Sequence, residues 1–150
     1  KDFSIFIDFS DTGYTQNNQA TIFHCMYEGT LEGGVLYPGI SISVQWNDDT
    51  KYGGLGGKYV LSNTVGSYDN MKILIEKNTT DNKINIYEND ELKYTADLSA
   101  VLTSIIDKHL LLGCYQTTNG IKNRFWKGTI NQCKIWFRNL SDSEKNELFS

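Results

Sequence analysis

The sequence is short of the residues that mark metal sites, disulfide frameworks and membrane spans. It has one proline, two histidines and three cysteines among 150 residues. Cys25, Cys114 and Cys133 lie in separate strand-like runs and form no C-x-x-C pair, which argues against a zinc site. Their odd number favours three buried thiols, although one disulfide with a spare thiol stays open. No apolar run approaches the roughly 20 residues of a membrane span.

Basic residues are scarce at the start of the chain. Residues 1–50 hold one lysine and seven acidic residues, whereas residues 101–150 hold seven basic and four acidic residues. The net charge is −4. A nucleic-acid partner is therefore not expected, because such proteins carry a basic patch. Solvated faces explain the uneven charge as well as a binding surface would.

What the chain has in quantity is aromatic residues and glycine. Aromatics make up 13% of the sequence and 13 glycines occur in it, a composition typical of strands joined by tight turns. The length suffices for one domain with its own core. There is neither a starting Met nor a signal-peptide pattern, so we expect a single domain, residues 1–150, excised from a longer chain.

The stretch Trp126–Phe149 carries the strongest pattern. Cys133, Ile135 and Phe137 alternate with Lys134, Trp136 and Arg138 and predict a half-buried strand. Ile130 falls out of this phase, which predicts a β-bulge near residues 131–132. The segment 141–144 then reads Ser-Asp-Ser-Glu, a capping box that predicts a short terminal helix.

Shorter patterns fill the rest of the chain. Alternating apolar residues predict strands over residues 3–9, 21–27, 40–46, 59–61, 71–75, 84–86, 92–94 and 110–115. Asn89-Asp90 predicts a tight hairpin turn. The glycine pairs within residues 52–57 predict a loop, and the apolar spacing of residues 98–106 predicts a helical face. Because no long crossover helix is available, an antiparallel two-sheet sandwich is the economical all-β architecture.

Several motifs resemble one family. Phe3–Phe9 resembles the opening "FTIxFWF" strand of concanavalin A-like jelly rolls, and Lys83–Leu92 is similar to their "klxlYvNGel", with Asp90 where that family prefers glycine. Leu112-Gly113 resembles "lxiG". Phe125–Leu148 is similar to "FxGxIddvrIwnraLsxeEixxL", which favours the laminin-G-like domains of bacterial surface and phage tail proteins. The resemblance implies a jelly-roll sandwich with a short C-terminal helix. It implies a fold more strongly than a function.

Catalytic chemistry finds little support. Glycosidases need two carboxylates across the scissile bond. Glu88 and Asp90 have part of that spacing, but no third acid follows at 92 or 93, and the segment also fits a hairpin turn. His24 and Cys25 are strand neighbours that point to opposite faces, so they form no nucleophile pair. We therefore predict that the chain is not an enzyme.

Calcium is the one metal with candidate ligands. Asp48 and Asp49 follow a strand, and laminin-G-like domains often bind calcium at a sheet rim. The same pair also fits an ordinary polar turn. The prediction is thus no cofactor, with calcium left open.

Two clusters combine flat aromatic rings with amide or guanidinium groups, the pairing that carbohydrate recognition requires. The candidate ligand-binding residues are Trp46, Asn47 and Tyr52 in one cluster, and Tyr115, Gln116, Arg124 and Trp126 in the other. The second cluster lies on two predicted strands joined by a short loop, so its members are expected near one another. Core packing is the competing interpretation for Trp46, which shares the phase of Ile42 and Val44, and for Trp126.

These clusters lead to a functional hypothesis. We expect a non-catalytic carbohydrate-binding or host-attachment module of an extracellular or phage tail protein, located outside the cell, on its surface or on a virion. Its partner would be a cell-surface glycan or polysaccharide, with homo-oligomers forming through the parent protein. The alternative is a structural spacer or a protein-interaction domain that binds no sugar.

Overall fold

The computed structural model describes residues 2–10, 20–25, 40–44, 51–55, 59–61, 71–97, 110–116, 122–123, 125–126 and 128–150. These residues form twelve strands and one helix. In chain order they are β1 (Phe3–Ser10), β2 (Ala20–Cys25), β3 (Ile40–Val44), β4 (Lys51–Leu55), β5 (Tyr59–Leu61), β6 (Met71–Asn78), β7 (Lys83–Glu88), β8 (Glu91–Asp97), β9 (Leu110–Leu112), β10 (Tyr115–Gln116), β11 (Lys122–Asn123), β12 (Thr129–Trp136) and α1 (Asp142–Phe149).

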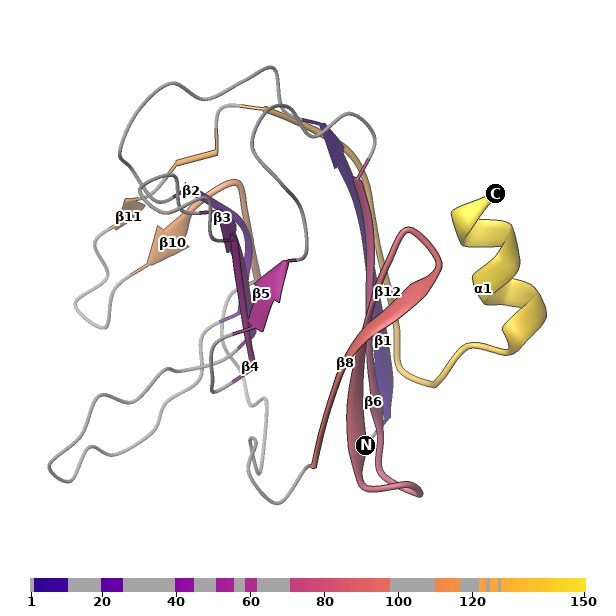
Figure 1. The fold of residues 1–150 in the computed structure, drawn as a ribbon. Coiled ribbons are helices and arrows are strands. Elements are labelled where there is room, and N and C mark those ends of the chain that lie inside the picture. The colour runs from indigo at the N-terminus through magenta and orange to yellow at the C-terminus, as the bar shows by residue number, and fades with distance from the viewer. Residues whose placement is uncertain are drawn as a thin grey trace, which may run out of the picture. The chain divides into compact units, whose positions relative to one another are not determined.

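The chain divides into two compact units, each built on an antiparallel sheet (Figure 1). Residues 1–13, 67–100 and 128–150 contain the sheet β12-β1-β6-β7-β8 and helix α1. Residues 14–66 and 101–127 contain the sheet β5-β4-β3-β2-β9 and the pair β10-β11. The expectation of antiparallel β structure with a C-terminal helix is confirmed. The helical face predicted for residues 98–106 lies outside the described residues.

Strand β12 carries the predicted bulge. Its partner is β1, with Asp8 opposite Gln132 and Phe9 opposite Ile130, so Asn131 is the extra residue. The side chain of Asn131 donates to the Asp8 carboxylate at 2.9 Å. The bulge restores the phase of Ile130 and lets β12 pair with β1 along its whole length, as the sequence predicts.

The β1–β6–β7 part of the sheet is buried on both faces. Ile5, Ile75 and Ile86 stand opposite one another across three strands, and each is at most 5% exposed. On the other face Phe6 and Leu74 form a core with Leu140, against which Trp136 and the end of α1 pack. The phase of β12 therefore places Trp136 under the terminal helix, as its alternation allows.

Helix α1 begins with the predicted capping box. The Ser141 hydroxyl accepts from the Glu144 backbone N–H at 3.3 Å, and the Glu144 carboxylate accepts from the Ser141 N–H at 2.8 Å. Two hydrogen bonds from Arg138, together with this backbone bond, lower the pKa of Glu144 to about 2. A lowered pKa stabilises the fold above the ordinary carboxyl value of 4.5, and this support is lost as pH falls towards 2.

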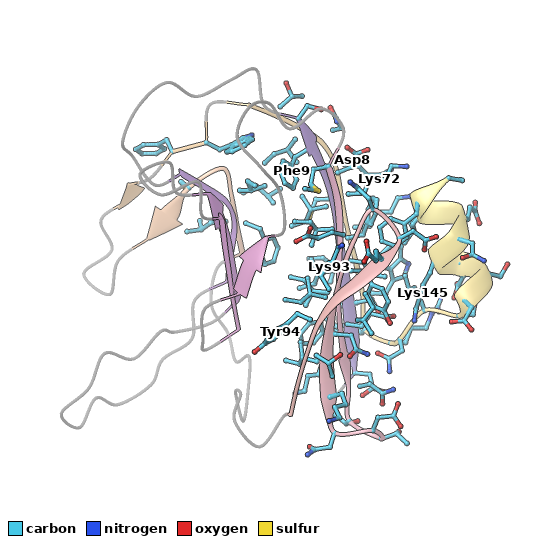
Figure 2. All side chains as sticks on the ribbon, viewed as in Figure 1. Asp8, Phe9, Lys72, Lys93, Tyr94 and Lys145 are labelled. Carbon is cyan, nitrogen blue, oxygen red and sulfur yellow. The ribbon has the colours of Figure 1, made fainter. Side chains whose placement is uncertain are left out.

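An ion pair to a buried carboxylate fastens the middle of α1 to the sheet. Lys145 Nζ lies 2.7 Å from Glu76 Oε2, and Glu76 is 3% exposed. Figure 2 shows Lys145 on the side of α1 that faces the sheet. Burial alone would lower the pKa of Lys145, but the hydrogen bond and charge of Glu76 outweigh it, and the pKa is raised. The Ser4 hydroxyl and the Leu140 N–H also donate to Glu76, so the carboxylate joins β1, β6 and the helix entry.

The glycine-rich segment is not the loop that its composition predicts. Residues 51–55 form β4, in which Gly53 lies opposite Ile42 of β3 and Tyr59 of β5. Hydrogen bonds from strands on both sides hold this backbone extended. Glycine has no strong preference of its own, so neighbouring strands decide its conformation.

The β7–β8 hairpin has the predicted two-residue turn. Asn89 and Asp90 both have positive φ, 46° and 73°, as expected of a type I′ turn. Asn89 also bonds to the adjacent strand, because its side chain accepts from the Lys72 N–H at 2.8 Å and its N–H donates to the Lys72 carbonyl at 2.9 Å. The turn is therefore tied to β6 as well as to its own strands.

The two cysteines with described side chains are free thiols. Cys114 is buried and Cys133 is half-buried. Burial raises the pKa of the Cys133 thiol, which lowers its reactivity. The side chain of Cys25 lies outside the described residues.

Replacing Asp90 by glycine should stabilise the chain by roughly 0.5–1 kcal/mol, because glycine adopts positive φ without a steric penalty. The unfolding midpoint should rise by about 2–4 °C in a thermal melt. Glu91→Gly is the matched control, since Glu91 lies in extended β8, and there the same residue should destabilise. Equal effects of the two glycines would contradict the turn assignment.

Replacing Lys145 by methionine should lower the free energy of unfolding by about 3 kcal/mol, because it leaves the Glu76 carboxylate buried without its cation. The double variant Glu76→Gln/Lys145→Met should recover most of that loss, since the glutamine amide still accepts from Leu140. Arg138→Met removes an exposed pair to the same helix and should cost much less than Lys145→Met, because solvent screens an exposed ion pair. Urea denaturation measures the free energy of unfolding of all three variants. Equal losses for Lys145→Met and Arg138→Met would contradict the stabilising role of the Lys145–Glu76 pair.

Candidate functional site

The structure describes the candidate ligand-binding residues unevenly. Trp46, Asn47 and Arg124 lie outside the described residues, as do the candidate calcium ligands Asp48 and Asp49. For Tyr52, Tyr115 and Gln116 the structure describes the backbone. Trp126 is described in full. The choice of site residues therefore stays a prediction, and the backbone shows which of them lie near one another.

The second aromatic cluster is brought together as two short strands. β10 pairs with β11, with Tyr115 opposite Asn123 and Gln116 opposite Lys122. This is the arrangement expected from two strands with a short connection. It places Tyr115 and Gln116 beside the segment that leads to Arg124 and Trp126.

Trp126 is positioned by the end of β9. Its backbone N–H donates to the Gly113 carbonyl at 2.7 Å, and the Gly113 N–H donates to the Ile22 carbonyl of β2 at 2.7 Å. Gly113 has φ 74°, whereas a Cβ there would meet Trp126 Cβ at 3.8 Å, an ordinary contact. The backbone conformation rather than space therefore calls for glycine. This geometry holds Trp126 next to the sheet edge where β10 begins.

The aromatic surface at this edge is larger than the sequence predicts. Phe125 is 59% exposed, and its neighbour Trp126 is half-buried. Phe125 lies in the run of the second cluster, between Arg124 and Trp126, although it was not chosen as a ligand-binding residue. Partial burial of Trp126 agrees with both interpretations made from the sequence, ligand binding and core packing, because the indole can pack inward while part of the ring stays exposed to solvent.

Tyr52 belongs to the same compact unit as Trp126. It is the second residue of β4, opposite Ser43 of β3 and Val60 of β5. Tyr52 is therefore part of an interior strand of its sheet, next to the strand that ends at Val44.

Glu88 and Asp90, the two acids with part of a glycosidase's spacing, lie in different surroundings. Glu88 ends β7 and is 4% exposed, whereas Asp90 lies in the turn. Among the described residues, no group of three or more His, Cys, Asp or Glu side chains could hold a metal ion. Within the same residues, no helix is long and apolar enough to cross a membrane.

Comparison by sequence finds no relative. No protein-family model matches the chain, and no curated protein matches it.

Comparison by structure finds sialidases. The NanB sialidase from Streptococcus pneumoniae is 15% identical, with a TM-score of 0.69 over 97% of this chain and 23% of that one. The sialidase from Trypanosoma rangeli is 12% identical, with a TM-score of 0.67 over 99% of this chain and 23% of that one. The chain thus spans under a quarter of these enzymes, at 23% of the length of each.

One similar structure is close to this chain in length. The CBM40 module of the IT-sialidase from Ruminococcus gnavus, in a structure bound to α2,6-sialyllactose, is 20% identical, with a TM-score of 0.64. The match covers 99% of this chain and 81% of that one. The chain therefore has a fold similar to a carbohydrate-binding β-sandwich module found in sialidases. This agrees with the concanavalin A-like resemblance at the level of the fold.

Proposed function

We propose that this chain is a non-catalytic carbohydrate-binding module. The observation that carries the proposal is the likeness to the CBM40 structure bound to α2,6-sialyllactose, which covers 99% of this chain and 81% of that chain. The matched sialidases add support, because the chain spans 23% of each of the two compared and so corresponds to a part of those enzymes. Sialylated glycans are accordingly the first ligands to test.

We infer that the β10–β11 edge is the binding surface. Tyr115 and Trp126 would supply aromatic surface for the C–H face of a sugar ring. Gln116 would bond hydroxyl groups, and Arg124 would bind the carboxylate of a sialic acid through charge-assisted hydrogen bonds. The described backbone supports this assignment, because β10 lies beside β11 and the Trp126 N–H donates to the carbonyl of Gly113, the residue after β9. Trp46, Asn47 and Tyr52 are proposed as a second contributing cluster.

The domain organisation and the parent protein are proposed from the sequence motifs. We propose a single domain of the two-sheet jelly-roll type, excised from a longer protein. A laminin-G-like module of a bacterial surface or phage tail protein, acting outside the cell or on a virion, is the context that the motifs favour. Homo-oligomers would then form through the parent protein, and calcium at Asp48 and Asp49 stays an open proposal.

A second candidate is a protein-interaction or spacer domain without sugar binding. It is favoured by exposed apolar residues on one face of β12 and the turn after it. Phe137 is 88% exposed and Ile135 is 40% exposed. Large apolar side chains in contact with solvent are common at interaction surfaces.

Titration with 6′-sialyllactose by isothermal calorimetry tests the first proposal. Trp126→Ala and Arg124→Ala should each weaken binding by at least about tenfold, because each removes a central contact of a small interface. Leu92→Ala, which truncates an exposed residue of the other unit, is the control and should bind like the natural chain.

Two outcomes would contradict the proposal. One is no binding to 6′-sialyllactose or to any sugar of a glycan array at millimolar concentration. If light scattering then shows a stable oligomer that Phe137→Asp dissolves, the interaction-domain candidate takes its place. The other is full retention of binding by both the Trp126 and the Arg124 variants, which would move the site elsewhere.

A further inference from the structure

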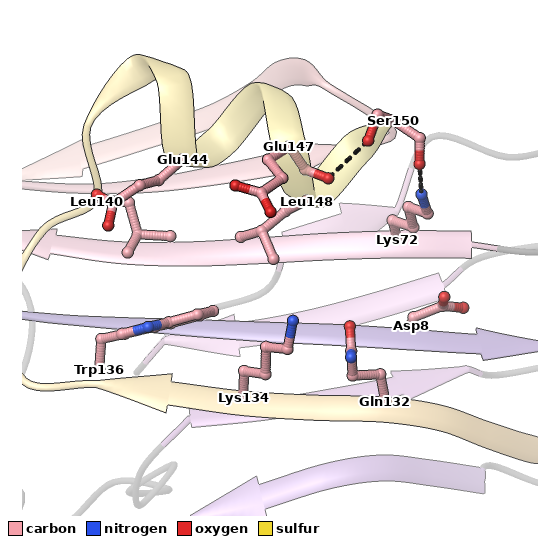
Figure 3. A pocket seen from close by; sticks show the side chains of 10 residues that line it. All are labelled: Asp8, Lys72, Gln132, Lys134, Trp136, Leu140, Glu144, Glu147, Leu148 and Ser150. Carbon is pink, nitrogen blue, oxygen red and sulfur yellow. Dashed lines mark hydrogen bonds between the residues drawn. The ribbon is translucent and has the colours of Figure 1, made fainter.

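A cleft lies between helix α1 and the sheet face beneath it, within a single compact unit (Figure 3). Its volume is about 380 Å³, within the range of roughly 300–1,000 Å³ that is usual for small-molecule sites. The lining residues come from β1, β6, β12 and the helical end of the chain: Asp8, Lys72, Gln132, Lys134, Trp136, Leu140, Glu144, Glu147, Leu148 and Ser150.

The cleft is held open by contacts at both ends of the helix. Just before the helix, Leu140 packs with Phe6 and Leu74, and at the middle of the helix Lys145 binds Glu76. Near its end, Leu148 packs against the same core, and Lys72 Nζ donates to the Ser150 carbonyl at 2.7 Å. The helix is thereby fixed over the sheet, while polar side chains of β12 occupy the space between.

Several charged groups in the cleft already have hydrogen-bond partners. Glu144 accepts two hydrogen bonds from Arg138, and Asp8 accepts one from Asn131. Lys72 is directed to the Ser150 carbonyl. These groups shape the rim and are not available to a ligand without loss of an existing bond.

Three other polar groups are available. Gln132 and Lys134 are exposed side chains of β12 that point up into the cleft, and Glu147 reaches down from α1 (Figure 3). Among the described residues, none forms a hydrogen bond or ion pair with the side-chain atoms of these three. They present one ammonium, one amide and one carboxylate, so their charges cancel. A neutral ligand with many hydroxyl groups satisfies such a set better than a charged one.

Trp136 supplies the apolar surface of the same cleft. It is half-buried and packs against the core of Phe6, Leu74 and Leu140, which restrains its ring. A restrained indole beside a few convergent polar groups is the combination that binds the C–H face of a sugar ring.

We propose that the α1–β12 cleft is a second saccharide subsite, in which a neutral hydroxyl-rich ring packs on Trp136 and bonds to Lys134, Gln132 and Glu147. The ligand class rests on the proposed function, but the site does not, because it shares no residue with the β10–β11 edge. The module would then have two glycan-binding sites. Two weak contacts to the same glycan surface raise the overall avidity, because the first contact increases the effective concentration for the second.

Nuclear magnetic resonance of the ¹⁵N-labelled chain tests the subsite, with lactose and 6′-sialyllactose as separate probes. Trp136→Phe assigns the indole N–H signal of Trp136. Both sugars should shift that signal and the Gln132 side-chain amide at millimolar concentration, since the neutral ring is the recognised part. Lys134→Ala should weaken the affinity derived from these shifts about tenfold, as expected for loss of a hydrogen bond to a charged group. Lys77→Ala, a lysine of the same sheet outside the cleft, should leave it unchanged.

The outcomes separate the two proposals. Shifts at Trp136 that persist in Trp126→Ala support the subsite, whether or not the β10–β11 edge binds. Shifts at Trp126 without any at Trp136 overturn the subsite and leave the proposed function standing. Shifts at Trp136 that Lys134→Ala and Gln132→Ala do not reduce also overturn it, as does the absence of shifts with either sugar.

Discussion

The buried carboxylate of Glu76 is the constraint on which the helical part of the structure depends. A charge with 3% exposure must be paired, because removal from water costs several kcal/mol. Lys145 Nζ at 2.7 Å, the Leu140 N–H at 3.2 Å and the Ser4 hydroxyl at 3.3 Å meet that need. These donors come from the helix, the helix entry and β1. One carboxylate on β6 therefore ties both the helix entry at Leu140 and the middle of α1 to the sheet.

The position of α1 has two consequences for the sheet beneath it. Phe6 and Leu74 become a core with Leu140 instead of a solvated face, so the middle of the sheet is apolar on both sides. Trp136 is held against that core while part of it lines the cleft. The same contacts that stabilise the helix thus prepare an immobilised aromatic surface with polar groups around it, which is what a binding site for a hydroxyl-rich ligand requires.

Fold and function have different support in this protein. The likeness to a CBM40 module at 20% identity concerns the arrangement of strands, and one such arrangement hosts binders, enzymes and spacers. A function has to come from side chains, and we propose two surfaces of this chain for it: the β10–β11 edge and the α1–β12 cleft. The motifs of the sequence lead to the first of them. The second contains Lys134 and Trp136, whose alternation on β12 is visible in the sequence, yet nothing in that alternation shows that a helix faces them.

Features set by neighbouring residues were determined by the sequence alone. The bulge at Asn131, the Ser141–Glu144 capping box and the Asn89-Asp90 turn each follow from a local pattern, because phase, caps and positive φ are decided within a few residues. Only the tertiary structure decided that the glycine pair at 53–54 is strand, that Lys145 meets Glu76, and that a cleft opens over Trp136. In each of these cases the interacting partner lies on another helix or strand. A local sequence pattern does not specify which distant segment will form the hydrogen bonds, pair with the charge or cover the apolar surface.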